Sequence, residues 1–186
     1  MGLLKRLATR PLQRSLGVLL MAFALAGAGA QVSEYQLKAV FLFNFAHFVE
    51  WPAAAFRRDD APFVIGVLGK DPFGRGLDDV VRGESVDRHP FAVERYPSVA
   101  DIRDCQILFI PASELGHLDG ILTSLKGHSV LTVTDADDTA PRGVIIELLR
   151  HDNRIRLRID LEAAKAGNLT ISSKLLRPAE IVGTGS

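Results

Sequence analysis

The sequence predicts an α/β fold with a mostly parallel sheet of about six strands, helices on both faces of the sheet, and a closing β-hairpin. Three observations support this prediction. Short apolar runs alternate with segments of helical periodicity, which is typical of βαβ units. Several of these runs are apolar at every position, as expected of strands that are buried on both faces. Near the end of the chain, two β-prone runs flank a polar turn, which indicates a hairpin.

The first 30 residues have the features of a signal peptide. Four basic residues and no acidic residue accompany an apolar stretch over residues 16–25, and small residues at 28–30 favour cleavage before Gln31. The apolar stretch is too short for a helix that spans a bilayer, so an uncleaved anchor is the less favoured alternative. We therefore expect residues 1–30 to be removed and residues 31–186 to form one domain in the periplasm, without membrane insertion.

Composition excludes several classes of function. Without the leader, the chain would carry 18 basic and 22 acidic residues, so we expect no bulk attraction to nucleic acid or anionic lipid. Cys105 is the only cysteine, which excludes an internal disulfide and a cysteine metal cluster. It precedes an apolar run, and we expect its side chain to be buried at the start of a strand.

The first predicted element of the domain, from Tyr35 to Trp51, is a helix that is apolar on nearly all sides and is ended by Pro52. It holds six of the chain's 13 aromatic residues. One of its faces carries Leu37, Val40, Phe41, Asn44, Phe45 and Phe48 at helical spacing. A helix of this kind must be covered on both sides, and monomers rarely expose a large apolar patch. We expect a partner or a second protomer to contact Tyr35, Phe43, Val49 and Trp51.

The rest of the chain alternates between strands and helices. Strands are predicted at 63–68, 91–96, 107–110, 130–134, 144–149 and 155–159. Helical segments are predicted at 76–81, 98–104, 113–125, 161–166 and 172–182. Ser98 and Ser113 are suitable capping residues, and Gly167 is suited to end a helix. Asp152 and Asn153 are suited to the turn of the hairpin.

Motifs that indicate catalysis or metal binding are weak, so we expect no catalytic residue, no cofactor and no metal. The nucleophile elbow of serine hydrolases is absent, and the five histidines lack metal-ligand spacing. His47 and Glu50 lie three residues apart on the helix, where a polar flank is favoured over a metal pair. Asp135, Asp137 and Asp138 lack the spacing of a calcium loop, and a solvated turn is favoured there.

The loop after strand 63–68 is a candidate ligand site. It connects a strand to a helix, and small anions and ligands often bind at such strand exits. Lys70, Asp71 and Arg75 are the side chains that could hold a ligand there. A plain connecting loop without a ligand is the favoured alternative.

Two polar features near the end of the chain are candidate contact surfaces. Arg154, Arg156 and Arg158 alternate with apolar residues, so one face of the last predicted strand is basic and could hold an acidic partner segment. A solvated face with local salt bridges is the favoured alternative. Ser173 stands beside two leucines and could belong to a recognition surface, although capping of the last helix is favoured.

Five motifs, in order, resemble those of the YfiR-like family of periplasmic proteins. They occupy residues 41–52 (Phe-Leu-Phe-Asn-Phe-Ala-His-Phe-Val-Glu-Trp-Pro), 67–74 (Val-Leu-Gly-Lys-Asp-Pro-Phe-Gly), 105–110 (Cys-Gln-Ile-Leu-Phe-Ile), 131–135 (Leu-Thr-Val-Thr-Asp) and 153–176. The similarity extends over residues 35–182. Each motif is weak alone, but five in the same order are specific.

The resemblance implies a function. The best-known members of the family are periplasmic repressors, typically dimers, which bind the periplasmic portion of an inner-membrane diguanylate cyclase and hold it inactive. This lowers cyclic-di-GMP and biofilm formation. Many relatives also have a cysteine where this chain has Gly66, so Cys105 lacks its expected partner and disulfide control is not expected. The alternative function is a periplasmic sensor that binds a small ligand near residues 69–75 and controls another membrane signalling protein.

Overall fold

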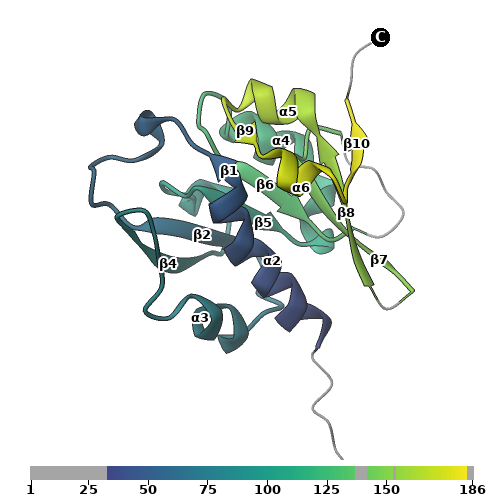
Figure 1. Cartoon of the computed structure of the whole chain (residues 1–186), viewed down its shortest axis with the longest axis horizontal. Helices are drawn as coiled ribbons and strands as arrows, with labels where there is room; N and C mark the ends of the chain where they lie inside the picture. The colour runs from purple at the N-terminus through teal and green to yellow at the C-terminus, as the bar shows by residue number, and fades with distance from the viewer. Residues whose placement is uncertain (1–32, 137–141, 153, 184–186) are drawn as a thin grey trace, which may run out of the picture. The chain divides into compact units, whose positions relative to one another are not determined.

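The computed structural model describes residues 33–136, 142–152 and 154–183. The predictions made for the leader, for Asp137 and Asp138, and for Asn153 lie outside these residues. Within them, the main sheet has eight strands in the order β10-β8-β7-β6-β5-β2-β4-β3, and a separate pair joins β1 to β9. Figure 1 shows α2, α5 and α6 in front of this sheet and α4 behind it.

The strands and helices have the following bounds. The strands are β1 Val49–Glu50, β2 Phe63–Leu68, β3 Ser85–Val86, β4 His89–Tyr96, β5 Ile107–Ile110, β6 Leu131–Thr134, β7 Ile146–His151, β8 Arg154–Asp160, β9 Thr170–Ile171 and β10 Glu180–Val182. The α-helices are α2 Glu34–Phe48, α3 Arg75–Val81, α4 Leu118–Ser124, α5 Leu161–Ala166 and α6 Ser173–Leu176. Short 3-10 turns cover Ala53–Ala55, Val99–Asp101 and Ala112–His117.

The sheet is mostly parallel, as predicted. Strands β4, β2, β5, β6 and β7 run parallel to one another, while β3 pairs antiparallel with β4, and β8 with β7. The main sheet has eight strands and not six, because β3 and β10 are too short to show an alternating pattern. Strand β10 pairs parallel with β8 on its outer side, so the sheet continues beyond the β7–β8 hairpin.

Apolar side chains from the central strands form two cores, one on each face of the sheet. In β5, Ile107 and Phe109 belong to the core under α2 and α3, whereas Leu108 and Ile110 belong to the core under α4. Each of these four side chains is fully buried. This two-sided burial explains why the strand is apolar at every position. The predicted helices on both faces are therefore confirmed.

Helix α2 begins and ends at residues whose backbone roles are clear. Ser33 and Gln36 form a reciprocal capping box at its start, which satisfies backbone N–H groups that the helix leaves unpaired. The helix ends at Phe48, not at Trp51 as predicted. Val49 is extended and pairs with Ile171 of β9, so a strand contact made far along the chain shortens the helix.

The other local predictions, of helix caps and helix bounds, have mixed outcomes. Gly167 caps α5, and Ser98 precedes a 3-10 turn as predicted. The segment 113–125 is not one helix, because a 3-10 turn over Ala112–His117 precedes α4. Ser113 does not cap it; Pro111 holds the cap position. The last predicted helix stops at Leu176, and residues 180–182 after Pro178 form β10.

Candidate functional site: the exposed face of α2 and its surroundings

Helix α2 exposes apolar side chains on the face that points away from the sheet. Leu37 is 36% exposed and Val40 is 41% exposed, and these two are the exposed large hydrophobic residues of the part of the chain that the structure describes. Phe41, Asn44 and Phe48 flank them and are half-buried. We call these five residues the α2 stripe. The apolar excess predicted for this helix therefore lies on the stripe.

Of the four residues that the sequence suggested for a contact, one is buried and three are half-buried. Val49 is buried in the core, so its side chain is not accessible to a partner. Phe43 is half-buried against Phe91, with ring centroids 5.2 Å apart. Trp51 donates a hydrogen bond from Nε1 to the carbonyl oxygen of Gln106 (3.1 Å). Tyr35 is also half-buried. Helical periodicity had placed the stripe residues on one face, but periodicity alone does not tell which face the sheet covers.

A buried charge network fixes the first turns of α2. Lys38 is 2% exposed, and its Nζ lies 2.9 Å from Oδ2 of Asp135, which is 7% exposed and follows β6. The hydroxyl of Tyr35 donates to the same carboxylate oxygen at 2.9 Å. Glu34 contacts Lys38 (2.5 Å) and Arg150 of β7 (3.1 Å). Helical periodicity did not predict this role of Lys38, although a lone lysine on an apolar helix is a detectable signal.

This network sets the orientation of the stripe. A buried ion pair adds little net stability, because removing both charges from water costs about as much as their attraction returns. Its geometry is nevertheless specific, since only one rotation of α2 brings Lys38 onto Asp135. That rotation directs Leu37 and Val40 away from the sheet.

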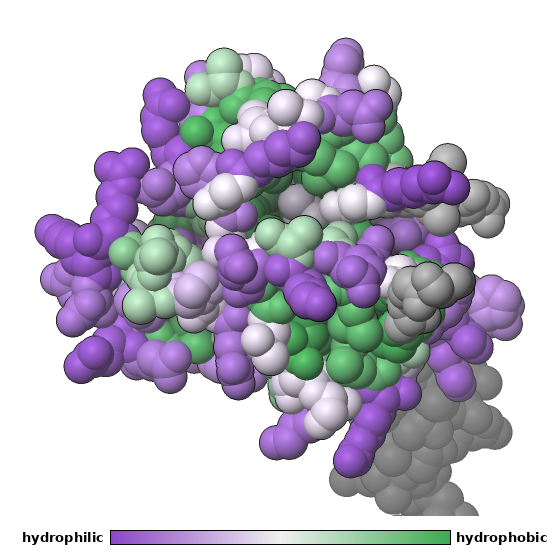
Figure 2. Space-filling model, turned by 90° about the horizontal axis from the view of Figure 1, so that it is seen from above, coloured by the Kyte–Doolittle hydropathy of each residue, from purple (hydrophilic) through white to green (hydrophobic). Residues whose placement is uncertain are grey.

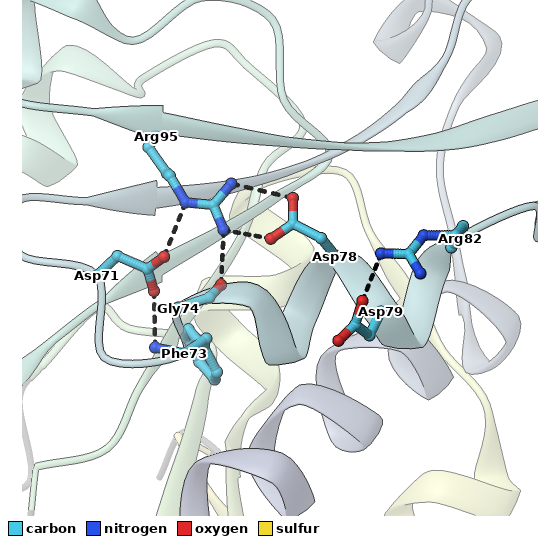
Figure 3. Close-up of polar contacts among 7 residues, drawn as sticks. All are labelled: Asp71, Phe73, Gly74, Asp78, Asp79, Arg82 and Arg95. Atoms are coloured by element: carbon cyan, nitrogen blue, oxygen red, sulfur yellow. Dashed lines mark hydrogen bonds and ion pairs between the residues drawn. The ribbon is translucent and has the colours of Figure 1, made fainter.

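The loop between β2 and α3, the candidate ligand site, is held by its own polar contacts (Figure 3). Arg95 of β4 donates from Nε to Asp71 at 2.7 Å, and from Nη2 to Asp78 at 2.5 Å and to the carbonyl oxygen of Gly74 at 2.9 Å. The other oxygen of Asp71 accepts from the Phe73 N–H at 2.7 Å. The hydrogen bond from Arg95 lowers the pKa of Asp78 below its ordinary value.

These contacts engage one of the three side chains that were candidates for holding a ligand. Asp71 serves the fold, whereas Lys70 and Arg75 are exposed on the loop and at the start of α3. Sequence reasoning did not find Arg95, because it lies 24 residues from Asp71 and reaches it only through the pairing of β2 with β4.

The basic face of strand β8 is partly neutralised by carboxylates of the two neighbouring strands. Arg158 is half-buried and lies 3.3 Å from both Glu147 of β7 and Glu180 of β10. Burial raises the pKa of Glu147, and Arg158 opposes that shift. Arg154 and Arg156 are exposed and form no ion pair within the described part of the chain.

The two serines before the last helix have different positions. Ser172 is the cap of α6, and its hydroxyl oxygen accepts from the Lys174 N–H at 3.3 Å. Ser173 is exposed in the first turn of this helix. Ser172, and not Ser173, therefore satisfies the backbone at the start of α6.

Cys105 is buried just before β5, as predicted, and its burial raises the pKa of the thiol to about 12. The space beside Gly66 of β2 is filled by another side chain. A Cβ atom at Gly66 would lie only 2.6 Å from Cε2 of Tyr96 and 3.2 Å from Cδ1 of Leu108. Any side chain at position 66 would thus require Tyr96 to move.

Two clefts adjoin the segment that follows α2. One, of about 520 Å³, is lined by aromatic residues that include Trp51, Phe56 and Phe63, and by the turn between β3 and β4. The other, of about 370 Å³, is lined by residues that include Pro52, Cys105 and His128. Among the described residues, no group of three or more His, Cys, Asp or Glu side chains could hold a metal ion.

Hydropathy alone does not single out one contact surface. On the face drawn in Figure 2, apolar patches lie between polar and charged side chains. The α2 stripe differs because its first two residues, Leu37 and Val40, are large, exposed and adjacent on a helix whose other face is already buried.

These features describe an α/β domain whose first helix exposes two large apolar side chains. The chain belongs to the YfiR/HmsC-like family (DUF4154), whose model matches residues 35–180. The resemblance seen in the sequence motifs is therefore confirmed. The family is one of periplasmic regulators, not of enzymes, and its members work with a protein partner in signalling.

A solved structure supports the fold. A crystal structure of a conserved domain protein from Vibrio cholerae O1 biovar El Tor strain N16961 is similar, with a TM-score of 0.51 and 12% sequence identity. The match covers 80% of this chain and 60% of that one, so the chain spans only part of that protein's length. No curated protein matches the chain. In the described part of the chain, no helix has the length and apolar character needed to span a bilayer.

Proposed function

We propose that this protein is a periplasmic negative regulator that binds the periplasmic domain of an inner-membrane diguanylate cyclase and keeps the cyclase inactive. Its action would lower cyclic-di-GMP and biofilm formation. Membership of a family of periplasmic regulators supports this proposal. The structural observation that carries it is the exposed pair Leu37 and Val40 at the N-terminal end of the α2 stripe.

Burial of the α2 stripe against a partner would be favourable in free energy. Complete burial of a leucine or valine side chain contributes about 1.5–3 kcal/mol, and part of that remains to be gained at both residues. A partner that covers the stripe only in its inactive state would gain this free energy in that state alone. Binding would then shift the cyclase population towards the inactive state, because a ligand shifts an equilibrium only by its differential affinity.

Export is part of the proposal. Cleavage of the leader before Gln31 would place the Ser33 cap and α2 close to the new N-terminus. We expect the protein recovered from the periplasm to have the intact mass of residues 31–186. An uncleaved chain in the membrane fraction would contradict this part of the proposal.

The test of the function is deletion of the gene with measurement of cellular cyclic-di-GMP. We expect the level to rise and to return when the wild-type chain is supplied again. An unchanged level would contradict the cyclase proposal. Homodimerisation is proposed as well, and sedimentation of the purified protein with Leu37→Gln and Val40→Gln variants would show whether a second protomer covers the stripe.

A further inference from the structure

The cleft beside Trp51 has properties that the proposed function does not yet use. Its lining includes the apolar side chains of Val49, Phe63 and Val86, all buried. Aromatic rings line it: Phe56 stacks on His89 with centroids 3.9 Å apart, and Trp51 meets Phe63 edge-to-face at 4.9 Å. These ring contacts, and the hydrogen bond from Trp51 to Gln106, hold the walls in place before any ligand arrives.

The rim of this cleft is acidic. Glu50, Asp59 and Asp87 line it and are exposed, and Arg88 is the single Lys or Arg among the lining residues. None of the three carboxylates forms an ion pair within the described part of the chain. Asp87 lies in the turn between β3 and β4 with φ of 53°, so the backbone turn presents its side chain at the rim.

The cleft also adjoins the C-terminal end of α2. Ala46 and His47, from the last turn of this helix, form part of its lining, and the stripe ends at Phe48 on another face of the same turn. A polypeptide bound along the stripe would therefore reach the end of α2 that adjoins the cleft.

We propose that this cleft receives an arginine or lysine side chain from the partner polypeptide, an inference that rests on the proposed function. The aliphatic part of such a side chain can pack against the partly exposed rings of Trp51 and Phe56. Its charge is attracted both by the carboxylates and by the faces of aromatic rings. A neutral or acidic side chain would leave three carboxylates unpaired in the contact. The charge of the rim thus selects a basic segment of the partner.

Trp51 gives a direct readout of the cleft, because it is the only tryptophan in the chain. The probe is the blocked peptide Gly-Arg-Gly-Arg-Gly, and the control is the same peptide with citrulline, which has a similar shape without the charge. We expect a saturable change in Trp51 fluorescence at millimolar concentrations of the arginine peptide, weakened by added salt. No saturable change, or an equal response to the citrulline peptide, would overturn the proposal.

Variants at the rim test the same cleft. The double variant Glu50→Gln/Asp87→Asn removes two charges with little change of shape, and asparagine tolerates the positive φ at position 87. We expect about tenfold weaker binding of the arginine peptide. The matched control Asp119→Asn/Glu162→Gln removes two exposed charges from α4 and α5 and should bind as the wild type does. Loss of binding in the control but not in the rim variant would contradict the proposal.

Binding of the periplasmic domain of the cyclase separates this inference from the proposed function. If that domain does not bind the wild-type protein, the proposed function fails, whatever the peptide result. If it binds the wild type and the rim variant equally, the inference fails and the proposed function stands. Self-association that the rim variant abolishes would identify a second copy of this chain as the occupant, and would also overturn the inference.

Discussion

Arg95 shows how one side chain organises a segment that is distant in sequence. Its guanidinium joins the carboxylates of Asp71 and Asp78 and the carbonyl oxygen of Gly74, so the loop after β2 is held against β4. The sequence predicted the loop, the strand before it and the helix after it. It could not predict the clamp, because the partner comes from the neighbouring strand of the sheet.

Asp78 should make stability depend on pH at the acid side. The hydrogen bond from Arg95 lowers its pKa, so the unfolded chain binds this proton more readily than the folded protein. The contribution of Asp78 to the free energy of unfolding is present above the ordinary carboxyl pKa of about 3.9. This contribution is lost as the pH falls further. Urea unfolding should therefore show Asp78→Asn to be less stable than wild type at pH 7, with the difference shrinking towards pH 2.5.

The size of this effect is small because Asp78 is partly exposed. Asp119→Asn, on α4, is the matched control and should lack the trend, since Asp119 forms no ion pair within the described residues. A difference between wild type and Asp78→Asn that stays constant with pH would contradict the role given to Arg95.

Cys105 should be chemically inert in the folded protein. Burial raises the pKa of its thiol to about 12, and the thiolate is the reactive form. We expect iodoacetamide at pH 8 to leave the native protein unmodified and to alkylate the chain in urea, as measured by intact mass. Rapid modification without urea would show that the side chain is accessible.

At the scale of elements, α2 runs across the sheet from the C-terminal ends of β2 and β6 to the N-terminal end of β2. Its first turns meet Phe73 and Asp135 beyond the ends of β2 and β6, and its last turn leads to Trp51, which meets Phe63 at the start of β2. Apolar periodicity predicted the helix and its apolar excess. It could not identify the exposed face, because that depends on which rotation brings Lys38 to Asp135.

The buried pair offers a test of how α2 is oriented. Lys38→Met leaves Asp135 buried with its cation removed, and breaking such a pair typically costs about 3–5 kcal/mol. The double variant Lys38→Met/Asp135→Asn removes both charges and keeps an acceptor for the Tyr35 hydroxyl. We expect urea unfolding to show a large loss for the single variant and a partial recovery for the double variant.

Two outcomes would contradict this view of the pair. A single variant as stable as wild type would show that the charges are solvated. Additive effects of Lys38→Met and Asp135→Asn, measured as a double-mutant cycle, would show that the two side chains do not act together.

At the scale of the whole molecule, the parallel sheet, its central strands and the family are predictable from sequence, because buried strands and ordered motifs leave strong patterns. Short strands are not. Strands β1, β3, β9 and β10 have two or three residues each, and tertiary pairing creates them. The Arg95 clamp and the acidic cleft depend on residues that only the folded chain brings together. The exposure of the stripe depends on which face of α2 the sheet covers.

The central claim is that the α2 stripe binds the periplasmic domain of a diguanylate cyclase. The most direct measurement is the affinity of that purified domain for wild type, for Leu37→Gln/Val40→Gln and for the control Thr123→Gln, which lies exposed on α4 at the other face of the sheet. We expect the stripe variant to bind at least about tenfold more weakly, with an unfolding free energy close to that of wild type. Wild-type affinity in the stripe variant would contradict the claim.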